Sequence, residues 1–411
     1  MARRNGGFIG TDGLDAPDPP TGVTGTEGNE QVSVAFTAPT DTGTSAITGF
    51  VAQVSIDGTD YSTGSNTGSS SPIVVSSLTN GTAATAKVWA INAYGTSAPS
   101  SASDSFTPKL QRALFAGGNN GDDAVVNILN VIQYIEIPTT GNTTDFGDLE
   151  AALQGRSPMG SSTTRGVWSG GNTGSGTVDS IRYVTMATTG NTTDFGDLTS
   201  AGWKLAGLSN STRGLTIGGN GRTRVIDYIT IASTGDATDF GDTSTYAEEA
   251  AGLSSSTRGV YSNLGSGNTN TGTVIEYVTI GSTGDATDFG DLSVGRGNLM
   301  GAMSNGTRGV FAGGNTGSVS NVMDYITIAS TGNATDFGNL TVARHDTTGT
   351  GSSTRGIVMG GNNGAGSGGG NPVDVIDYIT IASTGNATDF GNLAANTQKG
   401  AAISSDHGGL Q

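Results

Sequence analysis

The 411-residue sequence predicts an all-β protein in which a β-sandwich precedes six copies of one strand-rich unit. Three observations predict this fold class. Short runs of Val, Ile and Tyr are separated by turns rich in glycine, which contributes 69 residues. Residues 18–108 alternate apolar and polar residues, with a turn about every ten residues. From residue 111 onward one pattern recurs every ~49 residues.

Residues 1–17 precede the first predicted strand and show no periodicity. We expect them to form a docking arm that becomes ordered on a partner protein, with Phe8 and Ile9 as apolar anchors. The alternative is a terminus that stays disordered. Basic residues near the start are not followed by an apolar run, so no signal peptide is expected. No apolar stretch is long enough for a membrane helix, and no membrane insertion is expected.

Residues 18–108 are predicted to form short strands, among them 32–36, 50–56 and 85–92. The segment that runs from PDPPTGVTG through QVSVAFTAPTDTGTSAITGF to KVWAINAYGTSAPS resembles a fibronectin type III domain over nearly its full length. Phe36 stands where that family commonly has Trp, and Ala84 stands where its tyrosine corner would fall. The resemblance implies a β-sandwich that acts as a spacer or a weak adhesion unit.

Residues 109–411 contain the repeat. Each unit has Thr-Arg-Gly or a variant, an apolar strand, Gly-Gly, a variable loop, a strand such as Ile-Asp-Tyr-Ile-Thr-Ile, and Asp-Phe-Gly. A period near 50 with four strand-sized runs predicts the blades of a six-bladed β-propeller. The order Gly-Gly, Tyr, aromatic residue resembles the kelch repeat. The repeated charged residues are Arg112, Arg165, Arg213, Arg258, Arg308 and Arg355, and Asp145, Asp194, Asp239, Asp288, Asp336 and Asp389.

The two ends of the repeat region predict how a ring would close. The first unit starts at Arg112 and lacks the strand that precedes Thr-Arg-Gly in the other units. Residues 400–405 form an orphan strand that aligns with residues 301–304 of an earlier unit. We expect this strand to pair with residues 112–118, because such pairing removes an exposed edge.

The repeated charges are expected to be structural. An ion pair between the repeat Arg and the repeat Asp in every blade is favoured over a ring of arginines that binds an anionic ligand, because the two residue types occur in equal numbers. The Asp-rich turns are expected to be stabilised by their own backbone, with calcium binding as the alternative.

No catalytic residue, metal site or cofactor is expected. The chain has no cysteine and only two histidines, His345 and His407, which are too few for a histidine metal site or triad. The net charge of −17 opposes binding to nucleic acid. Carboxylate-pair chemistry stays open because acidic residues are plentiful.

Differences between the units concentrate in the loop between Gly-Gly and the Tyr strand, where the distance to the Tyr ranges from 9 to 17 residues. This variation indicates a contact surface. Trp168 and Trp203 lie in the repeat region, and each is either a core residue or an exposed ring that stacks on a sugar.

The order of arm, fibronectin-like domain and kelch-like repeat resembles virion proteins of tailed bacteriophages, and the opening MARRNGGFIGTDGLDAPDPPTG is similar to structural proteins of marine phages, particularly those that infect cyanobacteria. The resemblance implies a fibre or a decoration of capsid, neck or tail, made in the host cytoplasm and present in multiple copies. The arm would bind other virion proteins, and the propeller would contact a host-surface glycan or protein. The alternatives are a polysaccharide depolymerase and a bacterial surface adhesin.

Overall fold

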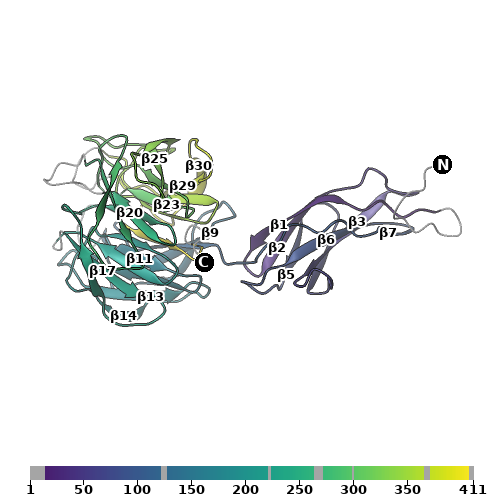
Figure 1. The fold of residues 1–411 in the computed structure, drawn as a ribbon, viewed down its shortest axis with the longest axis horizontal. Helices are drawn as coiled ribbons and strands as arrows, with labels where there is room; N and C mark the ends of the chain where they lie inside the picture. Colours follow the sequence, from purple (N-terminus) through teal and green to yellow (C-terminus); the bar gives the residue numbers. More distant parts are fainter. Residues whose placement is uncertain are drawn as a thin grey trace. The chain divides into compact units, whose positions relative to one another are not determined.

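The structure is a computed structural model that describes residues 14–121, 127–220, 224–262, 272–298, 300–364 and 371–406. The chain divides into two compact units, and the boundary falls between Leu110 and Gln111 (Figure 1). Every regular element in the described residues is a β-strand, as the all-β prediction requires. The described part of the chain contains no helix of the length and hydropathy needed to span a membrane.

The first unit contains two antiparallel sheets that share one core. Val32 and Val75 of one sheet and Phe50 and Val88 of the other are buried in the same cluster. Ala84, at the position of the missing tyrosine corner, is buried and pairs through its backbone with Phe106. The sheets have the orders β1-β2-β5 and β4-β3-β6-β7. Their strands are β1 (Thr21–Gly28), β2 (Gln31–Thr37), β3 (Ile47–Ser55), β4 (Gly64–Gly68), β5 (Ile73–Ser76), β6 (Thr85–Asn92) and β7 (Gly95–Thr96).

The second unit contains six four-stranded antiparallel sheets, which we number 1 to 6 in chain order. Sheets 2 to 6 each use four consecutive strands, and sheet 1 combines β8–β10 with the last strand, β31. The strands of sheets 1 to 3 are β8 (Arg112–Ala116), β9 (Val131–Glu136), β10 (Thr144–Asp148), β31 (Ala401–Ser404), β11 (Ser157–Ser161), β12 (Arg165–Ser169), β13 (Ser180–Thr185), β14 (Thr193–Asp197), β15 (Ala206–Ser209), β16 (Arg213–Ile217), β17 (Val225–Thr230) and β18 (Thr238–Asp242).

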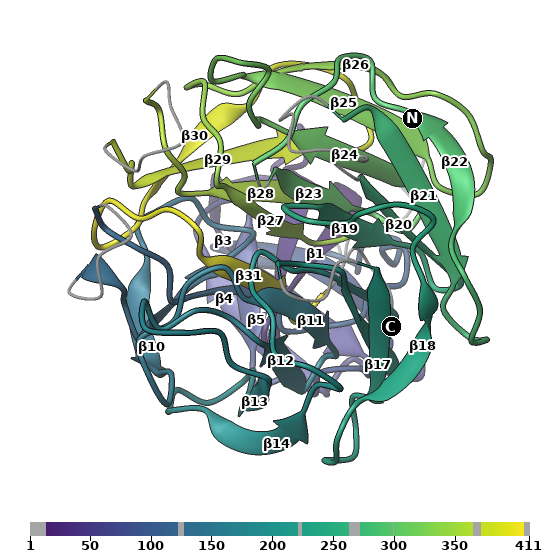
Figure 2. The same ribbon diagram turned by 90° about the vertical axis from the view of Figure 1, so that its left-hand side faces the viewer.

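Sheets 4 to 6 repeat this arrangement. Their strands are β19 (Ala251–Ser254), β20 (Arg258–Ser262), β21 (Val274–Thr279), β22 (Thr287–Asp291), β23 (Gly301–Ser304), β24 (Arg308–Ala312), β25 (Val322–Thr327), β26 (Thr335–Asn339), β27 (Thr348–Gly351), β28 (Arg355–Met359), β29 (Val375–Thr380) and β30 (Thr388–Asn392). The first strand of each sheet contacts the first strand of the next sheet. In sheet 1 the place of the first strand is taken by β31. Because β31 contacts both β27 of sheet 6 and β11 of sheet 2, the series of contacts returns to its start. Figure 2 shows the six sheets around a common centre.

Sheet 1 joins the two ends of the second unit. β31 pairs antiparallel with β8, which is the pairing that the sequence predicts for residues 400–405. Next to it, the Arg112 N–H donates to Ser405 Oγ at 3.0 Å, and Gln111 Nε2 donates to Asp406 Oδ2 at 3.1 Å. The last described residues therefore hold the first strand of the second unit in place.

Each sheet presents two different ends. At one end, which we call the turn face, the turns between third and fourth strands have one length in every sheet, as 186–192, 231–237 and 381–387 show. At the other end, which we call the loop face, the loops between second and third strands differ, from 218–224 to 360–374. The connections between successive sheets also lie on the loop face. The sheets are therefore alike on the turn face and unlike on the loop face.

The Gly-Gly step at the loop face has a steric cause. Gly118 has a φ of 98°, and a Cβ at this position would lie 2.6 Å from the carbonyl oxygen of Gln398. A side chain is excluded there because the connection from the preceding sheet passes against the step. The steric requirement applies to the Gly-Gly step alone, so the loop that follows it can vary in length.

Candidate functional site

The repeat arginines link neighbouring sheets through backbone carbonyls. The guanidinium of Arg165 lies over the ring of Tyr183 at 4.2 Å, and its Nη1 donates to the Ile231 carbonyl of sheet 3 at 2.8 Å. An equivalent bond joins each sheet to the next, so there are six in all. The last of them returns to sheet 1, where Arg355 of sheet 6 donates to the Ile137 carbonyl at 2.8 Å. The acceptors, in chain order of the arginines, are Met186, Ile231, Ile280, Ile328, Ile381 and Ile137.

The predicted ion pair between the repeat Arg and the repeat Asp is wrong. In each sheet the arginine lies on the second strand and the aspartate on the fourth, so a whole strand separates them by ~10 Å. The six aspartates are exposed on the outermost strands. Among them only Asp194 forms an ion pair in the described residues, and its partner is Arg182 of the third strand. Charge on an outer strand opposes edge-to-edge pairing with another sheet, which gives these aspartates a structural role.

The rest of the Asp-Phe-Gly motif fastens each sheet to the next. The Phe146 ring meets Tyr134 edge-on at 6.1 Å, and the Phe146 carbonyl accepts the Gly190 N–H of sheet 2 at 2.8 Å. Gly147 has a φ of 152°, and a Cβ there would lie 2.5 Å from the Gly190 carbonyl carbon. Asn191 Oδ1 accepts the Asp148 N–H at 3.0 Å. Equivalent bonds occur at all six junctions, which explains the repetition without a ligand.

A buried polar residue in the third strand also joins neighbouring sheets. Asp377 accepts the N–H and hydroxyl of Thr341 from sheet 5, at 3.1 and 2.6 Å. It also binds Arg344 at 3.0 Å, and both side chains are fully buried. Burial lowers the pKa of the Arg344 guanidinium, while the charge of Asp377 opposes that shift. The corresponding residues in sheets 1 and 3 to 5 are Gln133, Asp227, Glu276 and Asp324.

The junction between sheets 1 and 2 reverses these charges. The third strand here carries Arg182, and the preceding connection carries Glu150, whose carboxylate lies 3.3 Å from both Arg182 and Arg156. Burial raises the pKa of Glu150, but the two guanidinium groups and its hydrogen bonds together outweigh burial, and the net pKa is lowered. Neither Glu150 nor Arg182 was predicted from the sequence to have a role. The available signal was a single charged residue inside an apolar strand pattern.

The loop face has its most unusual backbone where the chain enters each innermost strand. One residue of every connection adopts a left-handed conformation, with φ between 53° and 62°, and we call this set the axial ring: Gly155, Lys204, Glu249, Asn298, Asp346 and Lys399. Their backbones bond around the centre, for example from Lys204 N–H to the Gly155 carbonyl at 2.7 Å and from Gly155 N–H to the Lys399 carbonyl at 2.8 Å. Non-glycine residues rarely adopt this conformation, so the surrounding structure maintains it.

The axial ring carries charges that differ from sheet to sheet. Lys204 forms an ion pair with Glu249 and lies 3.7 Å from Glu248. Burial lowers the pKa of Lys204, but the charges of Glu249, Glu248 and Asp346 outweigh it and the net pKa is raised. Burial also raises the pKa of the Glu249 carboxyl, and the charge of Lys204 offsets only part of this shift. Acidic and basic side chains therefore converge above the centre of the second unit.

The two tryptophans of the second unit differ in burial. Trp168 is fully buried, and its Nε1 donates to the Ala401 carbonyl at 3.2 Å, so it is a core residue. Trp203 is half-buried on the loop face, immediately before Lys204. The ammonium groups of Lys204 and Lys399 lie 4.9 and 5.9 Å from the centre of its ring. Of the two, only Trp203 presents an aromatic surface outside the core.

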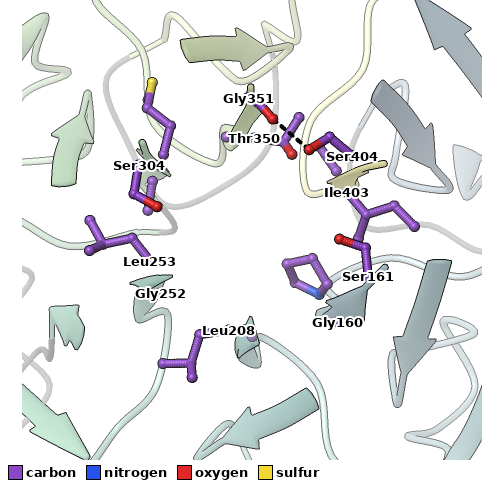
Figure 3. A pocket seen from close by; sticks show the side chains of 16 residues that line it. Gly160, Ser161, Leu208, Gly252, Leu253, Ser304, Thr350, Gly351, Ile403 and Ser404 are labelled. Atoms are coloured by element: carbon purple, nitrogen blue, oxygen red, sulfur yellow. Dashed lines mark hydrogen bonds between the residues drawn. The ribbon is translucent and has the colours of Figure 1, made fainter. Parts of the chain in front are cut away.

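A narrow axial cavity of about 50 Å³ lies between the innermost strands (Figure 3). Side chains such as Leu208, Leu253 and Ile403 line it, and none of its lining residues is charged. Serine hydroxyls at its rim bond to the neighbouring sheet, as Ser304 Oγ does to the Ser254 carbonyl at 2.7 Å. Because these polar groups are already paired with the protein, the cavity offers little to a polar ligand.

The described residues contain no cluster of three or more His, Asp or Glu side chains placed to hold a metal ion. His345 is buried beside Asp346, with Nδ1 3.2 Å from a carboxylate oxygen. Phe8, Ile9 and His407 lie outside the described residues. Most of the axial ring is buried, and the accessible side chains beside it are those of Trp203, Lys204 and Glu248.

No family model matches the sequence, and no curated protein matches it. Among solved structures, a crystal structure of domains A168–A170 from titin is 26% identical over 23% of this chain, with a TM-score of 0.22. The match covers 33% of the titin chain. These comparisons assign the chain to no family.

Proposed function

We propose that the chain is a structural and binding subunit of a phage virion, whose second unit is a closed six-bladed β-propeller with a kelch-like repeat and whose loop face contacts the host surface. The cycle of contacts between innermost strands supports the ring. The arginine and Asp-Phe-Gly bonds, which run through all six junctions, support it further. The first unit is proposed to be a fibronectin type III domain, on the resemblance of its sequence and its two sheets of three and four strands.

The observation that carries the binding role is the asymmetry between the two faces. The turn face repeats the same turns, whose polar groups bond to the neighbouring sheet. The loop face varies in loop length, in the charge of the axial ring and in its one half-buried tryptophan. A scaffold needs only what repeats, whereas recognition of one ligand requires differences. We therefore assign host contact to the loop face and attachment to the N-terminal region.

The experiment compares binding with hydrolysis on the same molecules. The full chain is applied to an array of bacterial surface polysaccharides and to whole host cells, and release of reducing ends is measured in parallel. We expect saturable binding without release of reducing ends, and we expect the protein in purified particles by mass spectrometry. Release of reducing ends would favour the depolymerase, and absence from particles would exclude the virion role.

A further inference from the structure

One sector of the loop face brings an aromatic ring and several polar side chains together. Asn220 follows the Gly-Gly step of sheet 3, and its N–H donates to the Trp203 carbonyl at 2.8 Å. Its side-chain Nδ2 donates to Glu248 Oε1 at 3.2 Å, and Lys204 lies 3.7 Å from the same carboxylate. We call Trp203, Lys204, Asn220 and Glu248 the sheet-3 patch.

The corresponding positions in other sheets do not form such a patch. The residues equivalent to Trp203 in sheets 1, 2 and 6 are Gln398, Gln154 and His345, and all three are buried. Trp203 is half-buried, Asn220 is exposed, and the Glu248 side chain keeps 32% of its surface exposed. The stretch from Gly219 to Tyr228 is the shortest of the six variable loops. The exposed Tyr246 lies two residues before Glu248.

We propose that the sheet-3 patch binds a neutral pyranose residue of a polysaccharide. This inference rests on the proposed function, for which it names a site and a ligand class. The half-buried indole ring of Trp203 supplies apolar surface for the C–H face of a sugar, beside the ammonium groups of Lys204 and Lys399. The bonds within the patch use Asn220 Nδ2 and Glu248 Oε1, so Asn220 Oδ1 and Glu248 Oε2 are available to accept hydroxyl groups of a sugar.

Charge selects a neutral sugar over an acidic one. The ammonium groups of Lys204 and Lys399 lie near the ring. They are outnumbered by the carboxylates of Glu248, Glu249 and Asp346, all of which act on Lys204. Glu248 and Glu249 oppose the approach of a carboxylate, and the net charge of −17 repels acidic polymers at longer range. We therefore expect the patch to prefer neutral hexoses to uronic acids.

The test uses tryptophan fluorescence and calorimetry of the full chain with cellohexaose, maltohexaose, mannohexaose and chitohexaose, and with hexagalacturonate as the acidic counterpart. Trp203 is the half-buried indole of the second unit, so binding of a neutral hexasaccharide should change its emission. Trp203→Ala should weaken binding at least tenfold, and Trp203→Phe should retain much of it without the emission change. Tyr94→Ala, which alters an exposed ring of the first unit, should leave affinity unchanged.

If Trp203→Ala lowers the melting temperature, Glu248→Gln and Asn220→Ala replace it as the test, since both change polar groups at the surface. Each should weaken binding of the neutral hexasaccharide. Equal affinity of these variants for the neutral sugar, or binding of hexagalacturonate alone, would overturn the sheet-3 patch and leave the binding role of the loop face intact. If the chain binds no saccharide and no host cell, the proposed function itself fails.

Discussion

Removal of residues 401–411 should prevent cooperative folding of the second unit or lower its melting temperature by more than 10 °C. The truncation removes β31, which supplies the innermost strand of sheet 1 and contacts both β27 and β11. Ala401, Ala402 and Ile403 are buried, and their loss together with the β8–β31 ladder removes on the order of 5 kcal/mol. Differential scanning calorimetry measures the effect, and the transition of the first unit should be unchanged.

The matched control removes residues 407–411 and keeps β31 and Asp406. This shorter truncation retains the bonds of Ser405 and Asp406 to Arg112 and Gln111, so its melting temperature should equal that of the full chain. Equal melting temperatures for both truncations would show that β31 does not hold the second unit together.

The second large loss of stability is expected from a substitution of Asp377. Asp377→Ala should destabilise the second unit by about 3–5 kcal/mol, because the Arg344 guanidinium would remain buried without its counter-charge. The variant also loses the bonds from Thr341 of the preceding sheet. Denaturant unfolding, followed by the fluorescence of the buried Trp168, measures the loss.

Asp389→Ala is the matched control, since Asp389 lies directly across from Asp377 on the next strand but is exposed. It should change stability by less than ~0.5 kcal/mol. Replacing both members of the buried pair, as Arg344→Met with Asp377→Leu, should restore most of the stability lost in the single variant. Similar losses for Asp377→Ala and Asp389→Ala would contradict the assignment of the buried junction.

The sequence predicted the strands of the second unit well because its repeat superimposes six copies of the same signal. The pairing of β31 with β8 followed from a missing strand at one end and an extra strand at the other. The role of the repeat charges could not be predicted in the same way. Equal numbers of Arg and Asp suggested ion pairs, but the separation of second and fourth strands by a third is a property of strand order and not of composition.

The candidate site was predicted in part. Variable loop length correctly drew attention to the loops that follow Gly-Gly, and Trp203 was singled out as a candidate aromatic surface. The axial ring was missed because its members share a backbone conformation and no residue type, so Lys204, Glu249 and Asp346 show no common pattern in the sequence. Asn220 becomes a neighbour of Trp203 through a β-bridge beside sheet 3, and Glu248 joins them from the connection that leads into sheet 4.

The central claim is that the loop face, where the sheets differ, is the binding surface. The chain has no cysteine, so single cysteines can be introduced at exposed positions of either face and labelled with a bulky maleimide. Asn220→Cys and Tyr246→Cys label the loop face. Thr212→Cys and Thr257→Cys label the turn face, where the turns between first and second strands also lie. Binding to host cells should be lost after labelling of the loop face and kept after labelling of the turn face. If labelling of the turn face abolished binding to host cells and labelling of the loop face left it intact, the loop face would not be the binding surface.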